Sequence, residues 1–426
     1  MKMVTLKQWI YILLLGFGYR EVATQLIQRG EVLYQFQLPE MTWQLAIITM
    51  LSALIISFLI PKTLRRPSDG FVLVYAAVVA IPKIFLVSTF QQLFFSDILI
   101  IISLLISPLV VIWVFSRVTF PLSGFGARGH ASSGGASLLY AIFGISFLLI
   151  LIEFRHSLDL DLGTHYDRRF AFRELGGSVA FGYFYNFFAL ALTPFITYAA
   201  MKEKKYVVLA LTILASILVF STSGEKFPFL MVIVSLGFSV IVSMERPLST
   251  SRIILLMSGV SVVALVEVSI LGGTLWGDYF FRRFIVVPAN NIELYYDFML
   301  SSPGGLWSGI EQKRATFIIG EHYFPGQETN LNVNFVFVEL AINGLIGTVV
   351  AATFLAFWLK LIDVAYQYTG DSNFFVVPLL IALLGYEQRI YSVFLSSGIC
   401  LLLVLIYISQ LSRHLSLNLP RFSGSN

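Results

Sequence analysis

An arginine pair precedes a polar and aromatic segment in an otherwise apolar chain. The segment reads FRRFIVVPANNIELYYDFM and places Arg282 and Arg283 shortly before Pro288. Proline suits the first turn of a helix, because the N–H that it lacks would have no intrahelical partner there. A helix from Pro288 to about Leu300 would direct free N–H groups towards the arginines. The pattern predicts an anion-binding edge that suits a phosphate group.

The predicted helix has one polar face. Asn290, Glu293 and Asp297 recur at separations of three and four residues, which places them on one side of a helix. Tyr295 falls on the opposite, apolar side. An interfacial helix with arginine anchors and a tyrosine belt is the alternative interpretation of the same segment.

A second cationic cluster lies in FRHSLDLDLGTHYDRRFAFRELGG. Arg169 and Arg173 are four residues apart and would share one face of a helix. Pairing with acidic neighbours such as Asp167 and Glu174 is the alternative. Two arginine clusters together indicate a shared anionic ligand, either a diphosphate or a carboxylated sugar.

Lys226 stands in the short connection STSGEKFPFL between two apolar segments. The topology predicted below places this turn outside, where short loops carry few basic residues. A lysine that works against this bias favours a role in holding an anion. A lysine that snorkels to the membrane surface is the alternative.

Two neighbouring residues in IIGEHYFPG are candidates for proton transfer. His322 has a side chain that titrates near neutral pH, so it can take a proton from a sugar hydroxyl. Glu321 can do the same if its pKa is raised. The pattern leaves both open as the general base, with a solvated loop histidine as the alternative.

Three charged residues fall within apolar segments, where charges are costly and often functional. Lys83, Glu267 and Glu339 would suit a proton relay in a transporter, or buried ion pairs. No metal or cofactor is predicted. The sequence lacks HExxH, CxxC, P-loop, GxGxxG and GxSxG patterns in a suitable context, and DLDLG is a single weak acidic pair.

The elements that must position these residues are membrane helices. The 426 residues are 57% hydrophobic and 12% charged, far from the roughly 45–50% apolar and 25% charged usage of soluble domains. This composition predicts an all-α polytopic membrane protein, with residues 1–426 as a single integral membrane domain. Cys400 is the only cysteine, so a disulfide framework is excluded. The net charge of +4 reflects loop bias and does not indicate nucleic-acid binding.

About twelve segments are long and apolar enough to cross the roughly 30 Å of hydrocarbon, which takes about 20 residues. The first favours a retained span over a removed signal peptide, because no small-residue cleavage pattern follows it. The segments lie near 5–24, 40–60, 70–90, 95–115, 136–153, 178–200, 206–221, 227–243, 253–272, 334–359, 373–389 and 391–410.

Lysine and arginine in the short loops predict the orientation, because basic short loops stay cytoplasmic. With the N-terminus inside, PKTLRRPSD, MKEKK and ERPLSTSR all fall on the cytoplasmic side. The C-terminus is then inside as well. Two large loops, about 154–177 and 273–332, lie outside. Both arginine clusters, Lys226 and His322 therefore share the outer face.

The second loop and the span after it resemble the Wzy-type oligosaccharide repeat-unit polymerases, the O-antigen polymerases of bacterial cell envelopes. The resemblance rests on RRFIVVPANNIELYYDF, IIGEHYFPG and NLNVNFVFVELAINGLIG, in that order. The stretch before the last helix is poorer in glycine than the family often has. The matching residues are Arg282, Arg283, Pro288, Tyr295, Tyr296 and Phe298, then Gly320 and Tyr323, then Asn330, Asn332, Asn343, Gly344 and Gly347.

The resemblance implies a metal-independent glycosyltransferase of GT-C-like architecture with no cofactor. A growing glycan on undecaprenyl diphosphate would be transferred to a lipid-linked repeat unit, and lipid diphosphate would leave. The protein would lie in the bacterial inner membrane with its site facing the periplasm. A flippase and a chain-length regulator would be its partners, and nucleic acid would not.

The resemblance also implies roles for the residues singled out above. Cationic side chains would bind the diphosphates and stabilise the leaving group, aromatic side chains would stack on sugars, and a base would take the acceptor proton. These are Arg169, Arg173, Arg282, Arg283 and Lys226 for the diphosphate, Tyr295, Tyr296 and Tyr323 for the sugars, and His322 or Glu321 for the proton.

Two other functions fit the sequence. An O-antigen ligase would use the same donor and leaving group with the lipid A core as acceptor. A lipid-linked oligosaccharide flippase would be expected to have inverted repeats and broken helices with polar residues at mid-membrane.

Overall fold

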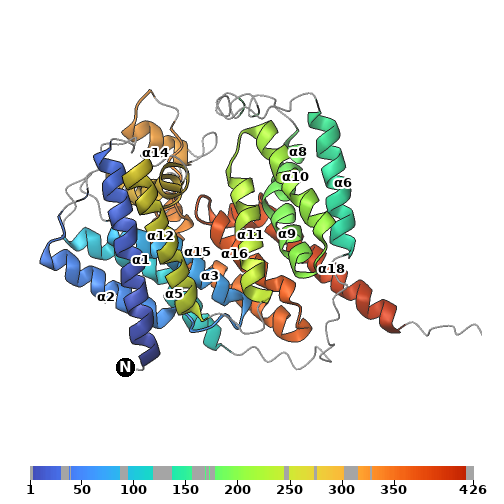
Figure 1. Cartoon of the computed structure of the whole chain (residues 1–426), viewed down its shortest axis with the longest axis horizontal. Coiled ribbons are helices and arrows are strands. Elements are labelled where there is room, and N and C mark those ends of the chain that lie inside the picture. Colours follow the sequence, from blue (N-terminus) through green and yellow to red (C-terminus); the bar gives the residue numbers. More distant parts are fainter. Residues whose placement is uncertain are drawn as a thin grey trace, which may run out of the picture. The chain divides into compact units, whose positions relative to one another are not determined.

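The computed structural model describes residues 3–29, 38, 40–86, 95–118, 137–155, 168, 172, 178–243, 249–272, 276–301, 315–326 and 329–418. Within these residues the elements are helices, and an isolated β-bridge joins Thr63 and Ser249 (Figure 1). The predicted helical polytopic membrane architecture is confirmed to this extent.

Nine helical stretches in the described part of the chain are long and apolar enough to cross a membrane. Three further apolar helices are shorter. Each of the twelve predicted segments overlaps one of these helices, and the number that cross the membrane stays a prediction. The nine are Leu6–Gln28, Pro67–Phe85, Phe95–Arg117, Ser137–Phe154, Val179–Lys202, Tyr206–Ser223, Thr250–Leu271, Phe335–Thr369 and Ile390–Gln410, and the three are Trp43–Leu59, Phe227–Val242 and Ser372–Leu384.

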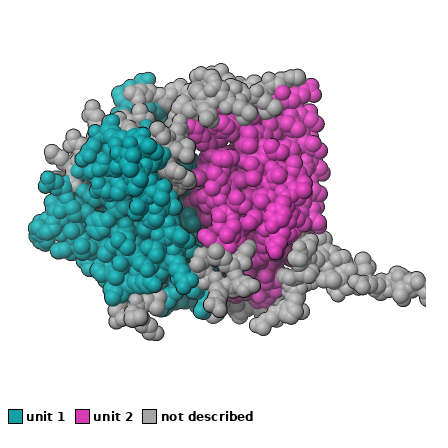
Figure 2. Space-filling view, in the orientation of Figure 1, with its two compact units in different colours: residues 1–124, 247–364, 385–390 teal, residues 125–246, 365–384, 391–426 magenta. Residues whose placement is uncertain are grey.

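The chain divides into two compact units, coloured teal and magenta in Figure 2. Unit 1 comprises 1–124, 247–364 and 385–390, and unit 2 comprises 125–246, 365–384 and 391–426. The chain therefore leaves unit 1 after residue 364 and returns to it for six residues. The expectation of a single membrane domain stays a prediction.

Unit 1 is built around the packing of α1 along α12, which lie side by side in Figure 1. On α1, the buried residues Ile12, Leu15, Tyr19, Val22 and Leu26 alternate at separations of three and four and so form one apolar stripe. Unit 1 contains α1 (Met3–Gln28), α2 (Trp43–Leu59), α3 (Pro67–Tyr75), η1 (Ala76–Ala80), α4 (Ile81–Phe85), α5 (Phe95–Arg117), α12 (Thr250–Leu271), η3 (Trp276–Val286), α13 (Val287–Ser301), α14 (Ala315–Tyr323) and most of α15 (Phe335–Thr369).

Unit 2 is centred on α9, which packs against both α10 and α11. The contacting face of α9 is buried throughout and includes Phe195, Ile196 and Ala199. Unit 2 contains α6 (Ser137–Phe154), α8 (Val179–Asn186), η2 (Phe187–Leu192), α9 (Thr193–Lys202), α10 (Tyr206–Ser223), α11 (Phe227–Ser243), η4 (Ser372–Phe375), α16 (Val376–Leu384), most of α17 (Ile390–Leu395) and α18 (Ile399–Asn418).

Each of the π-helical segments η1, η2 and η3 ends two residues before a proline. Proline has no N–H, and in an α-helix its ring meets the carbonyl group four residues earlier. A wider π turn accommodates that carbonyl and lets the helix continue. The prolines concerned are Pro82, Pro194 and Pro288.

Helix α15 is interrupted at Gly344, inside the predicted span 334–359. Gly344 has φ 63° and ψ −161°, a conformation that is essentially restricted to glycine. Before it, 335–343 forms a short helix, and residues 335–342 are buried. The side chain of Asn334 accepts the backbone N–H of Val336 at 3.0 Å and caps its start.

A second interruption lies between α16 and α17, where 385–389 forms a turn inside the predicted span 373–389. The backbone N–H of Phe335, at the start of α15, donates to the carbonyl oxygen of Gly385 at 2.9 Å. The two interrupted helices are thus joined through backbone groups that neither helix satisfies internally.

Candidate functional site

The three sequence segments on which the family resemblance rests are hydrogen-bonded to one another in unit 1. The Tyr323 hydroxyl on α14 donates to Oδ2 of Asp297 on α13 at 2.6 Å. The Tyr295 hydroxyl donates to the carbonyl oxygen of Leu331 at 2.8 Å, and Nδ2 of Asn291 donates to the carbonyl oxygen of Asn332 at 2.8 Å. Helix α13 therefore positions both α14 and the chain that leads into α15.

Helix α13 begins at Val287, so Pro288 lies in its first turn as predicted, but the N-terminus of the helix is not free. Helix α13 covers the predicted length, but it continues directly from η3, so Pro288 follows helical residues. The start of this helical segment lies at Trp276. There, Oε2 of Glu267 accepts the N–H of Gly277 at 2.9 Å. A carboxylate of the chain itself therefore lies at the start of this helical segment, and the free helix N-terminus expected beside Pro288 is not found in the described residues. The phosphate-binding role of the arginine pair stays a prediction.

Two residues of the polar face of α13, Asn290 and Glu293, are buried inside unit 1. Glu293 forms an ion pair with Lys83 on α4, and their side chains are 0% and 1% exposed. Taking two charges out of water costs several kcal/mol per ion, which their attraction and further hydrogen bonds must offset. The alternative of a buried pair, raised above for Lys83, is therefore the one observed.

Asn290 lies one turn before Glu293 and is 1% exposed. Neither Nδ2 nor Oδ1 of its amide has a hydrogen-bond partner among the described residues. Buried polar groups in folded proteins are almost always paired, so an amide in this state marks a place where water or a ligand is expected to bind. Asn290 thus gives the interior of unit 1 an unused donor and acceptor.

A second buried carboxylate is Glu339 in the short helix before Gly344. Its side chain is 0% exposed and receives Nε and Nη2 of Arg389 at 2.7 and 3.1 Å. Asn343 Nδ2 donates to the same carboxylate at 2.6 Å. The Arg389 side chain is 34% exposed. The pair therefore fixes an arginine that reaches the surface of unit 1.

The turn that carries Arg389 also contacts η3. The Tyr386 hydroxyl donates to the carbonyl oxygen of Phe284, and the two rings stack with centroids 6.3 Å apart. Phe284 lies four residues before Pro288, so its carbonyl oxygen lacks the α-helical partner that another residue would supply there. Burial raises the pKa of Tyr386, which keeps the hydroxyl proton available for this hydrogen bond.

The predicted diphosphate residues fall in different parts of the molecule. Arg282 is half-buried on η3 of unit 1, and the Arg283 side chain lies outside the described residues. Arg169 and Arg173 also lie outside them. Lys226 belongs to unit 2, at the start of the turn into α11. The shared diphosphate site therefore stays a prediction.

Both candidates for the general base are exposed on α14. The His322 ring makes edge-to-face contacts with Tyr323 and Phe298, with centroids 4.8 and 5.3 Å apart. These contacts hold His322 next to the Tyr323–Asp297 hydrogen bond. The choice between Glu321 and His322 as the base stays open.

The predicted sugar-stacking tyrosines differ in burial. Tyr295 is 0% exposed, so its ring would have to be uncovered before a sugar could stack on it. Tyr296 is 2% exposed and donates to Oδ1 of Asp97 at 3.1 Å. Burial and the Asp97 carboxylate raise the pKa of Tyr296 to about 12. Tyr323 is half-buried and is the most accessible of the three.

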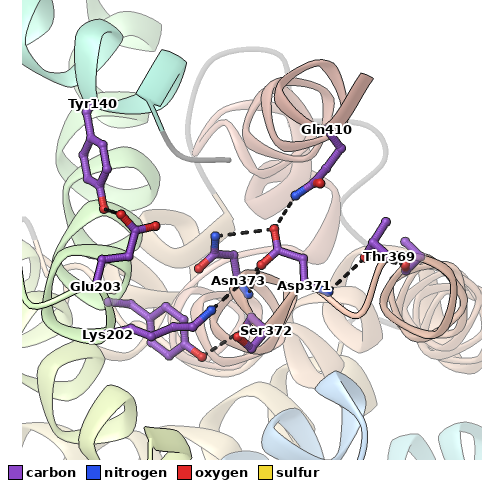
Figure 3. A network of polar contacts seen from close by, with 10 residues as sticks. Tyr140, Lys202, Glu203, Thr369, Asp371, Ser372, Asn373 and Gln410 are labelled. Atoms are coloured by element: carbon purple, nitrogen blue, oxygen red, sulfur yellow. Dashed lines mark hydrogen bonds and ion pairs between the residues drawn. The ribbon is translucent and has the colours of Figure 1, made fainter. Parts of the chain in front are cut away.

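Unit 2 contains a separate polar network, drawn in Figure 3. Asp371 accepts the backbone N–H of Asn373 at 2.9 Å and Nε2 of Gln410, and lies 4.0 Å from Nζ of Lys202. Its carboxylate thus links α9, η4 and α18. The network thus joins three helical elements of unit 2 through hydrogen bonds and an ion pair.

A second set of contacts in Figure 3 joins α6 to the end of α9. The Tyr140 hydroxyl donates to Oε2 of Glu203 at 3.0 Å, and Lys205 Nζ lies 2.8 Å from the same oxygen. The Lys205 ammonium also lies 4.1 Å from the centre of the Tyr140 ring. All three groups are partnered within the unit, which indicates a structural role.

Comparisons with known proteins leave the family open. No protein-family model matches the chain, and neither the curated proteins nor the solved structures compared with it give a match. Sequence reasoning missed Arg389 and Tyr386 because their turn was assigned to a continuous span. The signal that was available is the run GYEQR, which is too polar for the middle of an apolar segment.

Proposed function

We propose that this chain is an oligosaccharide repeat-unit polymerase of the O-antigen type. The observation that carries the proposal is that α13, α14 and the chain entering α15 are joined by hydrogen bonds of Tyr323, Tyr295 and Asn291. These are the segments on which the family resemblance rests. If the resemblance had arisen by chance, there would be no reason for these three segments to contact one another in the fold.

The proposed reaction transfers a glycan without a nucleotide sugar. A hydroxyl of the lipid-linked repeat unit attacks the anomeric carbon of the growing glycan, and the bond from that carbon to the lipid diphosphate breaks. The diphosphate leaves with the bonding electrons. The hydroxyl proton passes to Glu321 or His322, which are exposed on α14 beside Tyr323.

Arginines would stabilise the charge on the leaving diphosphate, since one guanidinium group can donate two parallel hydrogen bonds to phosphate oxygens. Arg282 and Arg283 are the proposed residues on η3, with Arg169, Arg173 and Lys226 as further contributors. The lipid tails would lie against the apolar helices. We propose the bacterial inner membrane as the location, the periplasm as the side of reaction, and a flippase and chain-length regulator as partners.

A lipid-linked oligosaccharide flippase is the second candidate. The interruptions of α15 at Gly344 and of the chain at 385–389 favour it, because transporters bind substrates at broken helices. The buried Lys83–Glu293 pair would suit a proton-coupled step. The exposed candidate bases on α14 have no role in this alternative.

Deletion of the gene in its native host distinguishes the candidates. Loss of a polymerase leaves lipopolysaccharide capped with single repeat units. Loss of a ligase leaves no attached glycan while long chains collect on the lipid carrier. Loss of a flippase also leaves no attached glycan, and single units collect on the cytoplasmic leaflet. The proposal requires the single-unit pattern, and either of the other two overturns it.

A further inference from the structure

We propose that Arg389 is a third arginine of the diphosphate site, positioned by Glu339 and tied to the arginine pair on η3. The inference rests on the proposed function, because it adds a contact for the same leaving group. Arg389 lies in the six-residue segment of unit 1 that the chain contributes between α16 and α17.

The geometry of the Glu339–Arg389 pair orients the guanidinium. Glu339 accepts from Nε and Nη2, so it holds one edge of the planar group. Asn343 fixes the same carboxylate from the other side at 2.6 Å. The two hydrogen bonds from Arg389 to Glu339 hold the planar guanidinium in a fixed orientation.

The burial of the pair is asymmetric. Glu339 is 0% exposed, whereas the Arg389 side chain is 34% exposed. A pair that served only to join two helices would be expected to bury both partners or to lie wholly at the surface. Here a buried carboxylate orients an arginine at the surface of unit 1. Residues behind a binding site orient the groups that contact a ligand in the same way.

Tyr386 connects this arginine to η3. It lies three residues before Arg389, and its hydroxyl donates to the carbonyl oxygen of Phe284, the residue after Arg283. The residue that follows the arginine pair and the turn that carries Arg389 are therefore in direct contact within unit 1, across 102 positions of sequence.

The predicted topology places all three arginines on one side of the membrane. The predicted span 373–389 ends on the face opposite the cytoplasmic termini, where the predicted loop 273–332 also lies. Arginine in a short outer connection works against the positive-inside tendency, which favours a role for it at that position. The chemistry that three arginines recognise is a diphosphate, borne by a lipid or free.

The test measures binding of geranylgeranyl diphosphate, geranylgeranyl monophosphate and inorganic pyrophosphate to the full chain in nanodiscs. The main variant is Glu339→Gln with Arg389→Gln, which removes both charges together and leaves no unpaired buried carboxylate. Arg389→Lys keeps the charge and loses the planar fork. Arg252→Gln removes an exposed arginine of unit 1 from the predicted cytoplasmic end and is the matched control.

We expect the double variant to bind geranylgeranyl diphosphate at least tenfold more weakly, and Arg389→Lys severalfold more weakly, while monophosphate binding changes less. Arg252→Gln should match the wild type. If the Arg389 variants weaken the binding of pyrophosphate as much as that of geranylgeranyl diphosphate, Arg389 contacts the diphosphate group alone. If they weaken only the binding of the lipid, the contact requires a diphosphate that is borne by a lipid.

The inference is overturned if a folded double variant, or Arg389→Lys where the double variant does not fold, binds the diphosphate lipid as the wild type does. The outcome is separable from that of the polymerase proposal. Weakened binding in a protein that extends no glycan leaves the site standing and removes the function. A variant that binds the diphosphate lipid as the wild type does and still extends the glycan removes the site and leaves the function standing.

Discussion

Lys83 on α4 and Glu293 on α13 form an ion pair with almost no exposed side chain, although 210 positions of sequence separate them. The pair joins the helix after η1 to the helix after η3. Each of these helices contains a proline that follows a π-helical segment. The charges thus join the two helices of unit 1 that follow the π-helical segments η1 and η3.

Removing one charge of this pair should destabilise the protein strongly. Lys83→Met or Glu293→Gln leaves its partner buried without compensation, which costs about 3–5 kcal/mol. The double change to Lys83→Met with Glu293→Met should recover most of this loss. Thermal unfolding of the detergent-solubilised variants measures the cycle. Single variants as stable as the wild type would contradict the burial of the pair.

Asn290→Leu should separate stability from activity. Its amide has no partner among the described residues, so replacing it with an apolar side chain of similar size removes a desolvation cost of about 1–3 kcal/mol. We expect a protein at least as stable as the wild type. If the amide serves a ligand, glycan extension should fall by tenfold or more. A less stable variant would mean that the amide is satisfied in the folded protein.

Gly344→Ala should disturb the interruption of α15. The φ of 63° and ψ of −161° at this position are strained for any residue with a Cβ atom, at a cost of about 1–3 kcal/mol. Ala341→Gly, a substitution inside the short helix, is a control for helix propensity alone. Unfolding midpoints and the protease sensitivity of α15 are the measurements. Tolerance of alanine without loss would indicate that α15 can be continuous.

Tyr386→Phe should weaken the contact between η3 and the turn at 385–389. The change leaves the carbonyl oxygen of Phe284 without its hydroxyl donor, at a cost of about 1–3 kcal/mol. Tyr407→Phe removes a hydroxyl from a residue that is 58% exposed and should have little effect. Hydrogen exchange of η3, compared between the two variants, checks the prediction. Equal exchange in both would remove the proposed role of Tyr386.

The sequence predicted the positions of the apolar helices well. Burial in a membrane demands long apolar runs with internally satisfied backbone groups, and such runs are visible directly in the residues. The predicted segments 40–60 and 227–243 also correspond to helices, the shorter Trp43–Leu59 and Phe227–Val242. The interruption at Gly344 was not visible, because glycine also packs inside continuous membrane helices.

The candidate site was predictable only in part. Pro288 suggested a free helix start. Proline suits both the first turn of a helix and a π-helical junction, and only the residues before it decide which occurs. Glu339 and Lys83 could be singled out as costly charges. Their pairing with Arg389 and Glu293 could not be predicted, because contacts across 50 and 210 positions leave no trace in local spacing.

Glycan extension by the purified protein tests the central claim most directly. The protein is incubated with its lipid-diphosphate repeat unit and no nucleotide sugar, and the products are resolved by length. The proposal predicts a ladder of longer chains from the wild type and from Arg252→Gln, and its loss in a folded Arg282→Gln variant. A wild-type protein that extends no cognate unit, or a ladder unchanged by Arg282→Gln, would contradict it.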